Sequence, residues 1–283
     1  MKLKRILVCL DSSAESLARI ETAFNIAGAG GAVVTAILPI HIEIPAIPTS
    51  TMHGGWYMGE KIISKSREQA MQSAKMIEEA CMLLAEEYQQ ELKWQQKEGD
   101  VALIVSEEGR YHDLLILGKP DPAHTSPSYR NSLNSILVES GTECLVMPDA
   151  APGFRNTANR VLVAWDGSRE SAAAVRGAMH FLDQANEIYI LTAYKGEDDK
   201  QAMEQMNQKI RDLMSVHGIE AGPVLIQQEG LSSGRSILKQ AGDINAELIV
   251  MGAYGHSRFR EIILGGATRY ILQHADVPVL FAH

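Results

Sequence analysis

The chain has 283 residues, of which 46% are hydrophobic and 22% are charged. This length suits two domains of about 140 residues each, and this composition is that of an ordered globular protein. The net charge is −9, and residues 1–150 carry 13 Lys and Arg against 20 Asp and Glu, which argues against the concentrated basic surface that duplex nucleic acid requires.

The N-terminal segment is typical of a buried strand. Its apolar run, residues 6–10, ends at Asp11 and is far shorter than the core of a signal peptide. No apolar stretch reaches the roughly 20 residues that cross a bilayer, so we expect a cytoplasmic protein that does not enter a membrane. Cys9, Cys81 and Cys144 form no CxxC pair, and we expect them to be buried as small hydrophobic side chains in a reducing compartment.

The sequence repeats itself once. The first pair of similar segments is offset by 155 residues and two further pairs by 134, so the first repeat contains 21 additional residues. We therefore predict two domains, residues 1–150 and 154–283, joined by a short Pro/Gly linker. The three pairs are Arg5–Ser13 with Arg160–Ser168, Asp113–Gly118 with Glu247–Gly252, and Cys144–Met147 with Pro278–Phe281.

The additional residues are predicted to form a loop insertion at residues 39–61, which holds three prolines and the pair Gly54-Gly55. Its cluster Trp56, Tyr57 and Met58 allows three interpretations: a lid over a pocket, a contact for assembly, or ordinary loop packing.

The chain alternates short apolar runs with helical stretches. The runs lack period-two alternation, as expected for strands buried on both faces, and the helical stretch Ser64–Leu92 repeats apolar residues at intervals of three and four. This alternation predicts two tandem doubly wound α/β domains with parallel five-stranded sheets, which bind ligands at the carboxyl ends of their strands. The predicted strands are 6–10, 33–38, 114–117 and 145–147, then 161–165, 188–193, 224–226, 248–251 and 277–281.

The segment 251–268 carries the clearest functional pattern. Two residues separate its first two glycines, nine separate the second from a glycine pair, and a helix is predicted to follow. Glycines at a strand exit leave room for a ligand, and free N–H groups at a helix start favour an anion. The pattern therefore predicts a cradle for a triphosphate. Its residues are Met251, Gly252, Gly255, Gly265, Gly266, Ala267 and Thr268, with the Thr268 hydroxyl as a further donor.

The loop inside this frame adds positive charge. His256, Arg258 and Arg260 would place further donors beside the phosphates. In the alternative interpretation, the glycines serve only as turns and helix caps and the arginines form a solvated face. The strand, loop and helix around the frame favour the phosphate interpretation.

The frame Gly-x2-Gly-x9-Gly, followed by a last helix and the strand Ala-Asp-Val-Pro-Val-Leu, resembles the ATP-binding signature of the universal stress protein family. The segment VAWDGSRES, residues 163–171, resembles the first strand and turn of that family. The resemblance covers the whole chain, twice over, and implies ATP as the ligand, with or without Mg²⁺. In the family a Ser or Thr follows the last glycine of the motif, whereas this chain has Gly266 there and a hydroxyl only at Thr268.

The same resemblance implies two further contacts with an adenine nucleotide. Asp166 would lie beside the ribose or a bound metal, and the backbone of Ala193 would meet the adenine. From the residues alone, an aspartate that ends a parallel strand suits a ribose. It equally suits an N-cap or an Asx turn before the helix predicted for Arg169–Leu182, and both roles can hold at once.

The first repeat lacks the glycine frame. Gly118 matches Gly252, but no glycine occupies residues 119–140, and prolines in this segment remove N–H groups that a phosphate cradle uses. We expect this repeat to bind triphosphate poorly or not at all. The resemblance implies instead that the last strands of the two repeats pair antiparallel to form an internal pseudo-dimer, and it allows a homodimer of whole chains.

No catalytic motif accompanies the predicted site. The sequence has no GxxxxGK[ST], GxSxG or HExxH and no paired-cysteine metal site, and His180 and His274 lie in helical runs. We expect at most slow ATP hydrolysis. The favoured interpretation is a nucleotide-responsive binding protein in stress physiology, in which ATP orders the loop 253–264. The alternatives are a nucleotide-free scaffold and a flavin- or nucleotide-dependent enzyme on the same fold.

Overall fold

The computed structural model describes residues 2–11, 13, 15–28, 31–42, 55–120, 127–148, 154, 158–194, 197–228, 233–254 and 265–283. The elements of the first half are β1 (Arg5–Cys9), α1 (Glu15–Ala27), β2 (Val33–Ile40), α2 (Gly55–Tyr88), β3 (Leu92–Glu98), α3 (Val101–Gly109), β4 (Leu114–Gly118), α4 (Pro127–Glu139) and β5 (Cys144–Met147). Those of the second half are β6 (Arg160–Ala164), α5 (Arg169–Gly177), α6 (Met179–Leu182), β7 (Glu187–Tyr194), α7 (Glu197–Val216), β8 (Val224–Gln228), α8 (Ser233–Asp243), β9 (Leu248–Gly252), α9 (Gly266–His274) and β10 (Val279–Ala282).

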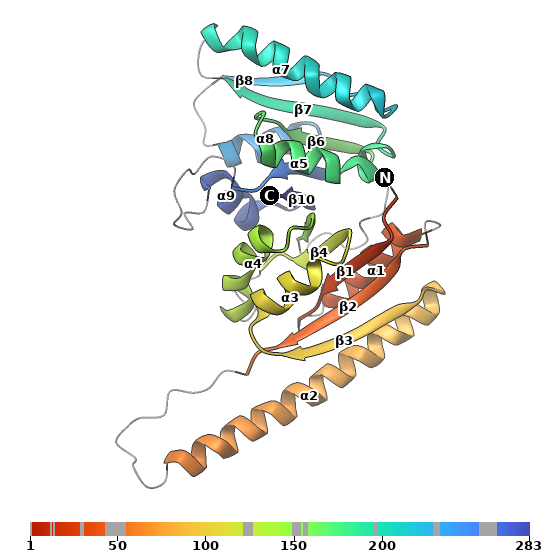
Figure 1. Ribbon diagram of the computed structural model, residues 1–283, viewed down its shortest axis with the longest axis vertical. Helices are drawn as coiled ribbons and strands as arrows, with labels where there is room; N and C mark the ends of the chain where they lie inside the picture. Colours follow the sequence, from red (N-terminus) through yellow and green to blue (C-terminus); the bar gives the residue numbers. More distant parts are fainter. Residues whose placement is uncertain are drawn as a thin grey trace.

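These strands form one sheet in the order β3-β2-β1-β4-β5-β10-β9-β6-β7-β8 (Figure 1). Neighbouring strands are parallel within each half, and the halves meet where β5 pairs antiparallel with β10. In that pairing Leu145 lies opposite Leu280, and Cys144 lies opposite Phe281. The predicted fold of two tandem α/β units with five parallel strands each is confirmed, and the antiparallel pair joins the two sheets into one.

Both faces of the sheet are buried because successive residues of a strand point to opposite sides. Ile6 and Val8 of β1 are fully buried in the core that α1 and α2 cover. Leu7 and Cys9 are fully buried in the second core, which α3 and α4 cover. This two-sided burial explains the continuous apolar runs in the sequence, and it leaves the ends of the strands as the places where a ligand can reach the sheet.

Helix α2 differs from the expected element. It begins at Gly55 and ends at Tyr88, and β2 continues through Ile40, so the loop predicted for residues 39–61 is shorter than the sequence indicated. The remainder of that loop, residues 43–54, lies outside the described residues. Hydrophobic periodicity reports burial, and no residue between 60 and 73 is buried. Residues 60–73 of α2 therefore gave no sign of the start of this helix.

Two more elements differ from the prediction. β3, with the sequence LKWQQKE, buries only Leu92 and forms one edge of the sheet, where polar and charged side chains discourage pairing with other chains. Its sequence therefore shows no alternation of apolar and polar residues, and the sequence analysis did not predict this strand. The helix predicted for Arg169–Leu182 is divided into α5 and α6 at Ala178.

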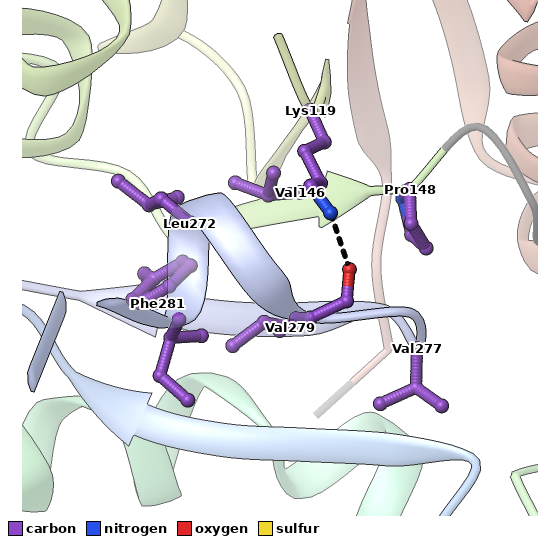
Figure 2. A pocket seen from close by; sticks show the side chains of 9 residues that line it. Lys119, Val146, Pro148, Leu272, Val277, Val279 and Phe281 are labelled. Atoms are coloured by element: carbon purple, nitrogen blue, oxygen red, sulfur yellow. Dashed lines mark hydrogen bonds between the residues drawn. The ribbon is translucent and has the colours of Figure 1, made fainter. Parts of the chain in front are cut away.

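Side chains also cross the boundary between the halves. Lys119, just after β4, donates a hydrogen bond from Nζ to the carbonyl of Ala275 at 2.8 Å, and the hydroxyl of Tyr254 donates to Oδ1 of Asn134 in α4 at 3.0 Å. Figure 2 shows that the Lys119 bond spans a small pocket whose lining comes from both halves. The described lining residues are Lys119, Val146, Pro148, Ile271, Leu272, Ala275, Val277, Val279 and Phe281.

Candidate functional site

The strand register brings three carboxyl ends together in the second half. Ala164 of β6 lies opposite Met251 of β9 on one side and opposite Leu191 of β7 on the other. Residues that lie two positions beyond a common register share one edge of the sheet. In this half they are Asp166, Ala193 and Ala253. Two predicted site residues, Asp166 and Ala193, therefore lie at the same edge as the start of the glycine frame.

Asp166 forms an Asx turn at this edge. Its Oδ1 accepts hydrogen bonds from the N–H of Ser168 at 3.0 Å and from the Ser168 hydroxyl at 2.6 Å. Ser168 is the N-cap of α5, where its Oγ accepts from the N–H of Ser171 at 3.1 Å. Of the local roles predicted for Asp166, the Asx turn is confirmed and the N-cap belongs to Ser168. Because Asp166 is exposed, the turn holds a carboxylate at the open edge.

The backbone N–H and C=O of Ala193 lie on the side of β7 that faces β6, beyond the last residue of β6. The N–H of Trp165 donates to the carbonyl of Leu191 at 2.9 Å, so Leu191 pairs toward β6. Alternate residues of a strand point their N–H and C=O groups to the same side. Ala193, which is exposed, therefore points its N–H and C=O toward the space where β6 has ended. The family resemblance implies an adenine contact with these backbone groups, and that contact stays a prediction.

Met251 and Gly252 are both required by the packing of the fold. Met251 is 4% exposed and lies in the core. A Cβ on Gly252 would lie 2.6 Å from backbone atoms of Glu170 and Ser171. Gly252 thus makes room for the first turn of α5, where the sequence had suggested room for a ligand. The close approach places the start of α5 against the exit of β9.

The described residues leave the start of α9 open. Gly265 is its N-cap and provides no side-chain cap, and the first N–H groups of a helix have no partner inside it. A Cβ on Gly266 would meet nothing within 4 Å, and a Cβ on Gly265 would meet nothing nearer than 3.7 Å. Ala267 follows in the same turn. Described side chains therefore do not fill this corner.

Thr268 and Tyr254 join the start of α9 to the exit of β9. Thr268 is only 2% exposed, and its Oγ1 accepts a hydrogen bond from the N–H of Tyr254 at 3.4 Å. Tyr254 adopts a φ of 64°, in the left-handed region that few non-glycine residues occupy. Sequence reasoning missed Tyr254, and its position inside the glycine frame was the available signal.

The remaining predicted residues, Gly255, His256 and Arg258, lie in residues 255–264, outside the described part of the chain. The structure thus brings together the ends of β6, β7 and β9 and the start of α9. The predicted residues that it places there are Asp166, Ala193, Gly252, Gly265, Gly266, Ala267 and Thr268, whereas Met251 belongs to the core.

The corresponding corner of the first half is filled by an arginine. Arg19 of α1 is 3% exposed, and its guanidinium lies 3.0 Å from Oδ1 of Asp11, the counterpart of Asp166. The same guanidinium donates to the hydroxyl of Ser16 at 2.7 Å. A Cβ on Gly118 would lie 2.2 Å from an Arg19 nitrogen. Sequence reasoning missed Arg19, although a basic residue among the core-facing positions of an amphipathic helix was a detectable signal.

Two further differences from the second repeat remove backbone donors from the corresponding edge of the first repeat. The N–H of Gly118 donates to the hydroxyl of Tyr129 at 3.0 Å, because α4 begins at Pro127, earlier than α9 does in the second repeat. The N–H of Leu10 donates to the carbonyl of Ile37 at 2.9 Å, as Trp165 does to Leu191. The residue two positions later is Pro39, which has no N–H to offer. Poor binding of triphosphate by the first repeat stays a prediction, which this geometry favours.

Other types of site find little support among the described residues. No group of three His, Cys, Asp or Glu there is placed to hold a metal ion, and no described helix is long and apolar enough to span a membrane. Burial raises the pKa of Cys9 and of Cys144 to about 12, so these thiols stay protonated and unreactive. The pocket of Figure 2 has about 180 Å³ of space, part of it open to solvent, and its largely apolar walls do not suit phosphates.

These features define a tandem doubly wound α/β protein in which the described side chains leave the carboxyl edge of the second repeat's sheet open. The sequence profile of the universal stress protein family matches residues 157–283. A universal stress protein from Synechocystis sp. is 26% identical over 175 residues, which cover 59% of this chain and 57% of that protein. The match thus spans little more than half of the relative's length.

Solved structures extend the likeness to the whole fold. The crystal structure of a universal stress protein from Archaeoglobus fulgidus has a TM-score of 0.72 and 17% identity, with 98% of this chain and 97% of that chain covered. A putative universal stress protein from Pseudomonas aeruginosa has a TM-score of 0.63 and 16% identity, with 99% and 93% covered. The family's profile thus matches the second half of this chain, and the solved structures share the tandem fold over its whole length.

Proposed function

We propose that the second repeat binds ATP or a related adenine nucleotide and that the protein acts in the stress response as a nucleotide-responsive binding protein. The observation that carries this proposal is the open start of α9 at Gly265 and Gly266, at the same edge of the sheet as Asp166 and Ala193. In this proposal the phosphates lie at α9, the ribose beside Asp166 and the adenine against the backbone of Ala193.

The start of α9 supports the phosphate position. Free N–H groups and the helix dipole favour an anion there by about 0.3–1 kcal/mol for each charge at an exposed site. Gly266 is exposed and has open space where a side chain would stand. A phosphate oxygen can therefore approach the backbone N–H groups of Gly266 and Ala267 directly.

Asp166 supports the ribose position and a role for Mg²⁺. A carboxylate oxygen can accept hydrogen bonds from ribose hydroxyls. Mg²⁺ commonly binds one or two carboxylates together with substrate phosphates and water. The described residues offer no larger cluster of acidic ligands, so Mg²⁺ would enter with the nucleotide.

Tyr254 supports a response to the nucleotide. Its N–H is bonded to Thr268 in the proposed phosphate corner, and its hydroxyl is bonded to Asn134 in the first half. Movement of the β9 exit on binding would therefore alter a contact between the two repeats, which act as an internal pseudo-dimer in this proposal. The three buried free cysteines fit a cytoplasmic setting.

Isothermal titration calorimetry with Mg-ATP tests the proposal on the purified full chain. Gly266→Val should lower the affinity at least about tenfold, because its side chain would occupy the phosphate position. Gly242→Val is the matched control, since Gly242 in α8 is also exposed with open space for a Cβ. Absence of binding to the unaltered protein would favour a nucleotide-free scaffold, and equal affinity of both variants would place the phosphates elsewhere.

A further inference from the structure

Helix α2 exposes an unusual share of apolar surface. Ile62, Met71, Met76 and Leu83 lie on α2, and they are four of the eight large hydrophobic side chains that are exposed in the described part of the chain. Three of them follow a heptad spacing, because Leu83 is seven residues after Met76 and Ile62 is fourteen before it. Residues seven apart share one face of a helix. We call Ile62, Met76 and Leu83 the outer stripe of α2.

The outer stripe points away from the body of the protein. Ala74 and Cys81 on the inner side of α2 are fully buried, whereas Ile62, Met76 and Leu83 are 45%, 66% and 68% exposed. α2 has 34 residues and is therefore about 51 Å long. Figure 1 shows its N-terminal turns extending beyond the end of β3. A large part of the helix thus has no covering for its apolar side chains.

The exposed charges of α2 are distributed unevenly along its length. Residues 55–71 hold three Lys and Arg against two Glu, whereas residues 72–88 hold one Lys against four Glu, so the N-terminal half is weakly basic and the C-terminal half is acidic. An antiparallel pair of α2 helices would place the basic end of each against the acidic end of the other. A parallel pair would place like charges together, which is unfavourable. The charge pattern is therefore complementary to itself in the antiparallel orientation.

The charge pattern also disfavours a lipid surface. Residues 55–88 contain four Lys and Arg against six Glu, so the helix is acidic overall. Helices that lie on membranes are usually rich in Lys and Arg on their polar face, which attracts anionic lipids. A protein partner with the opposite polarity of charge suits this surface better, and a second copy of α2 has that polarity.

We propose that the outer stripe of α2 binds the outer stripe of a second copy of this chain in an antiparallel helix pair. The alignment that places Ile62 of each helix opposite Leu83 of the other has its centre between Gln72 and Ser73. It brings Lys61 and Lys65 of one helix within about two residues of positions opposite Glu86 and Glu79 of the other. The interface would be isologous, so each contact occurs twice. This surface is separate from the β5–β10 seam, which lies inside the chain.

Sedimentation velocity over a range of protein concentrations tests this proposal. We expect a reversible dimer whose dissociation constant rises about 100-fold in Met76→Glu and in Leu83→Glu, because each change occurs twice and one such buried side chain is worth roughly tenfold. Both positions are exposed, and Glu has a helix propensity similar to that of Met and Leu, so the fold should be kept. Val216→Glu in α7 is the matched control, since Val216 is 84% exposed and lies outside α2.

Cross-linking distinguishes the orientation. The three native cysteines are buried, so a cysteine introduced at an exposed position is the one that a short bis-maleimide reaches. Gln72→Cys should give cross-linked dimers and Glu87→Cys should not, whereas a parallel pair would cross-link both. A protein that stays monomeric, a dimer unaffected by Met76→Glu, or binding of the monomer to anionic phospholipid vesicles through α2 would overturn the proposal.

Discussion

Replacing Arg19 by Ala should destabilise the protein strongly, because the carboxylate of Asp11 would be left partly buried without the Arg19 cation. The Arg19 and Asp11 side chains are 4% and 18% exposed, and their nearest charged atoms are 3.0 Å apart. Breaking a buried ion pair by removing one member costs about 3–5 kcal/mol. We expect Arg19→Ala to lower the free energy of unfolding by this amount, with the partial exposure of Asp11 favouring the lower end.

Urea unfolding followed by circular dichroism measures this change. Arg67→Ala is the matched control, because Arg67 pairs with Glu98 at the surface, where the side chains are 56% and 45% exposed. Exposed pairs contribute about 0–1 kcal/mol. Adding Asp11→Asn to Arg19→Ala should restore part of the loss. The Asn Oδ1 can still accept from the N–H of Ser13, as Asp11 does at 2.8 Å, and the uncompensated charge is gone.

The cost of Arg19→Ala should also depend on pH. Desolvation raises the pKa of Asp11, but the Arg19 charge and hydrogen bonds from Ser13 outweigh it and hold the pKa below its ordinary value of 3.8. A lowered folded-state pKa stabilises the protein above the unfolded value, and this contribution is lost as the pH falls through the folded value. The difference between wild type and variant should therefore shrink below about pH 4.

Two results would refute this reasoning. One is an Arg19→Ala cost no larger than that of Arg67→Ala, which would mean that the buried pair behaves like an exposed one. The other is an equal cost near neutral pH and near pH 3, which would mean that the Asp11 charge is not involved.

Two further substitutions test the second repeat. Gly252→Ala should cost about 1–3 kcal/mol in urea unfolding, because the added Cβ would lie 2.6 Å from the backbone of α5, whereas Gly266→Ala should stay within about 0.5 kcal/mol; equal costs would contradict the packing role. Asp166→Asn should keep the stability, because Asn can accept the Ser168 bonds, and lower the Mg-ATP affinity about tenfold by calorimetry; an unchanged affinity would remove Asp166 from the site.

The fold could be predicted from the sequence wherever burial leaves a pattern. Strands such as Leu114–Gly118 are buried on both faces and therefore contain only apolar residues and a closing glycine. The pairing of β5 with β10 was expected from the family resemblance and from the need to cover an apolar edge. β3 buries only Leu92 and residues 60–73 of α2 bury none, so hydrophobic periodicity could not mark the limits of these elements.

The site was only partly predictable, because backbone placement and side-chain filling are set by tertiary packing. The ends of β6 and β9 and the start of α9 follow from strand and helix limits, and the structure places Asp166 and Gly265 there. The sequence analysis did not predict that Gly252 packs against the backbone of α5, because the contact with Glu170 joins segments 82 residues apart in the sequence. The filling of the first repeat by Arg19 was missed for the same reason.

The two repeats place the same carboxylate at the end of their first strand and differ in what surrounds it. In the first repeat Arg19 neutralises Asp11 from inside the core, and the Tyr129 hydroxyl bonds the backbone at the end of β4. In the second repeat the position of Arg19 is taken by Ala174, which is fully buried and uncharged. This position of α5 therefore supplies no charge, and Asp166 lies exposed at the edge of the sheet. In our proposal the exposed carboxylate of Asp166 meets a nucleotide-bound Mg²⁺, whereas the carboxylate of Asp11 in the first repeat meets the Arg19 guanidinium of its own chain.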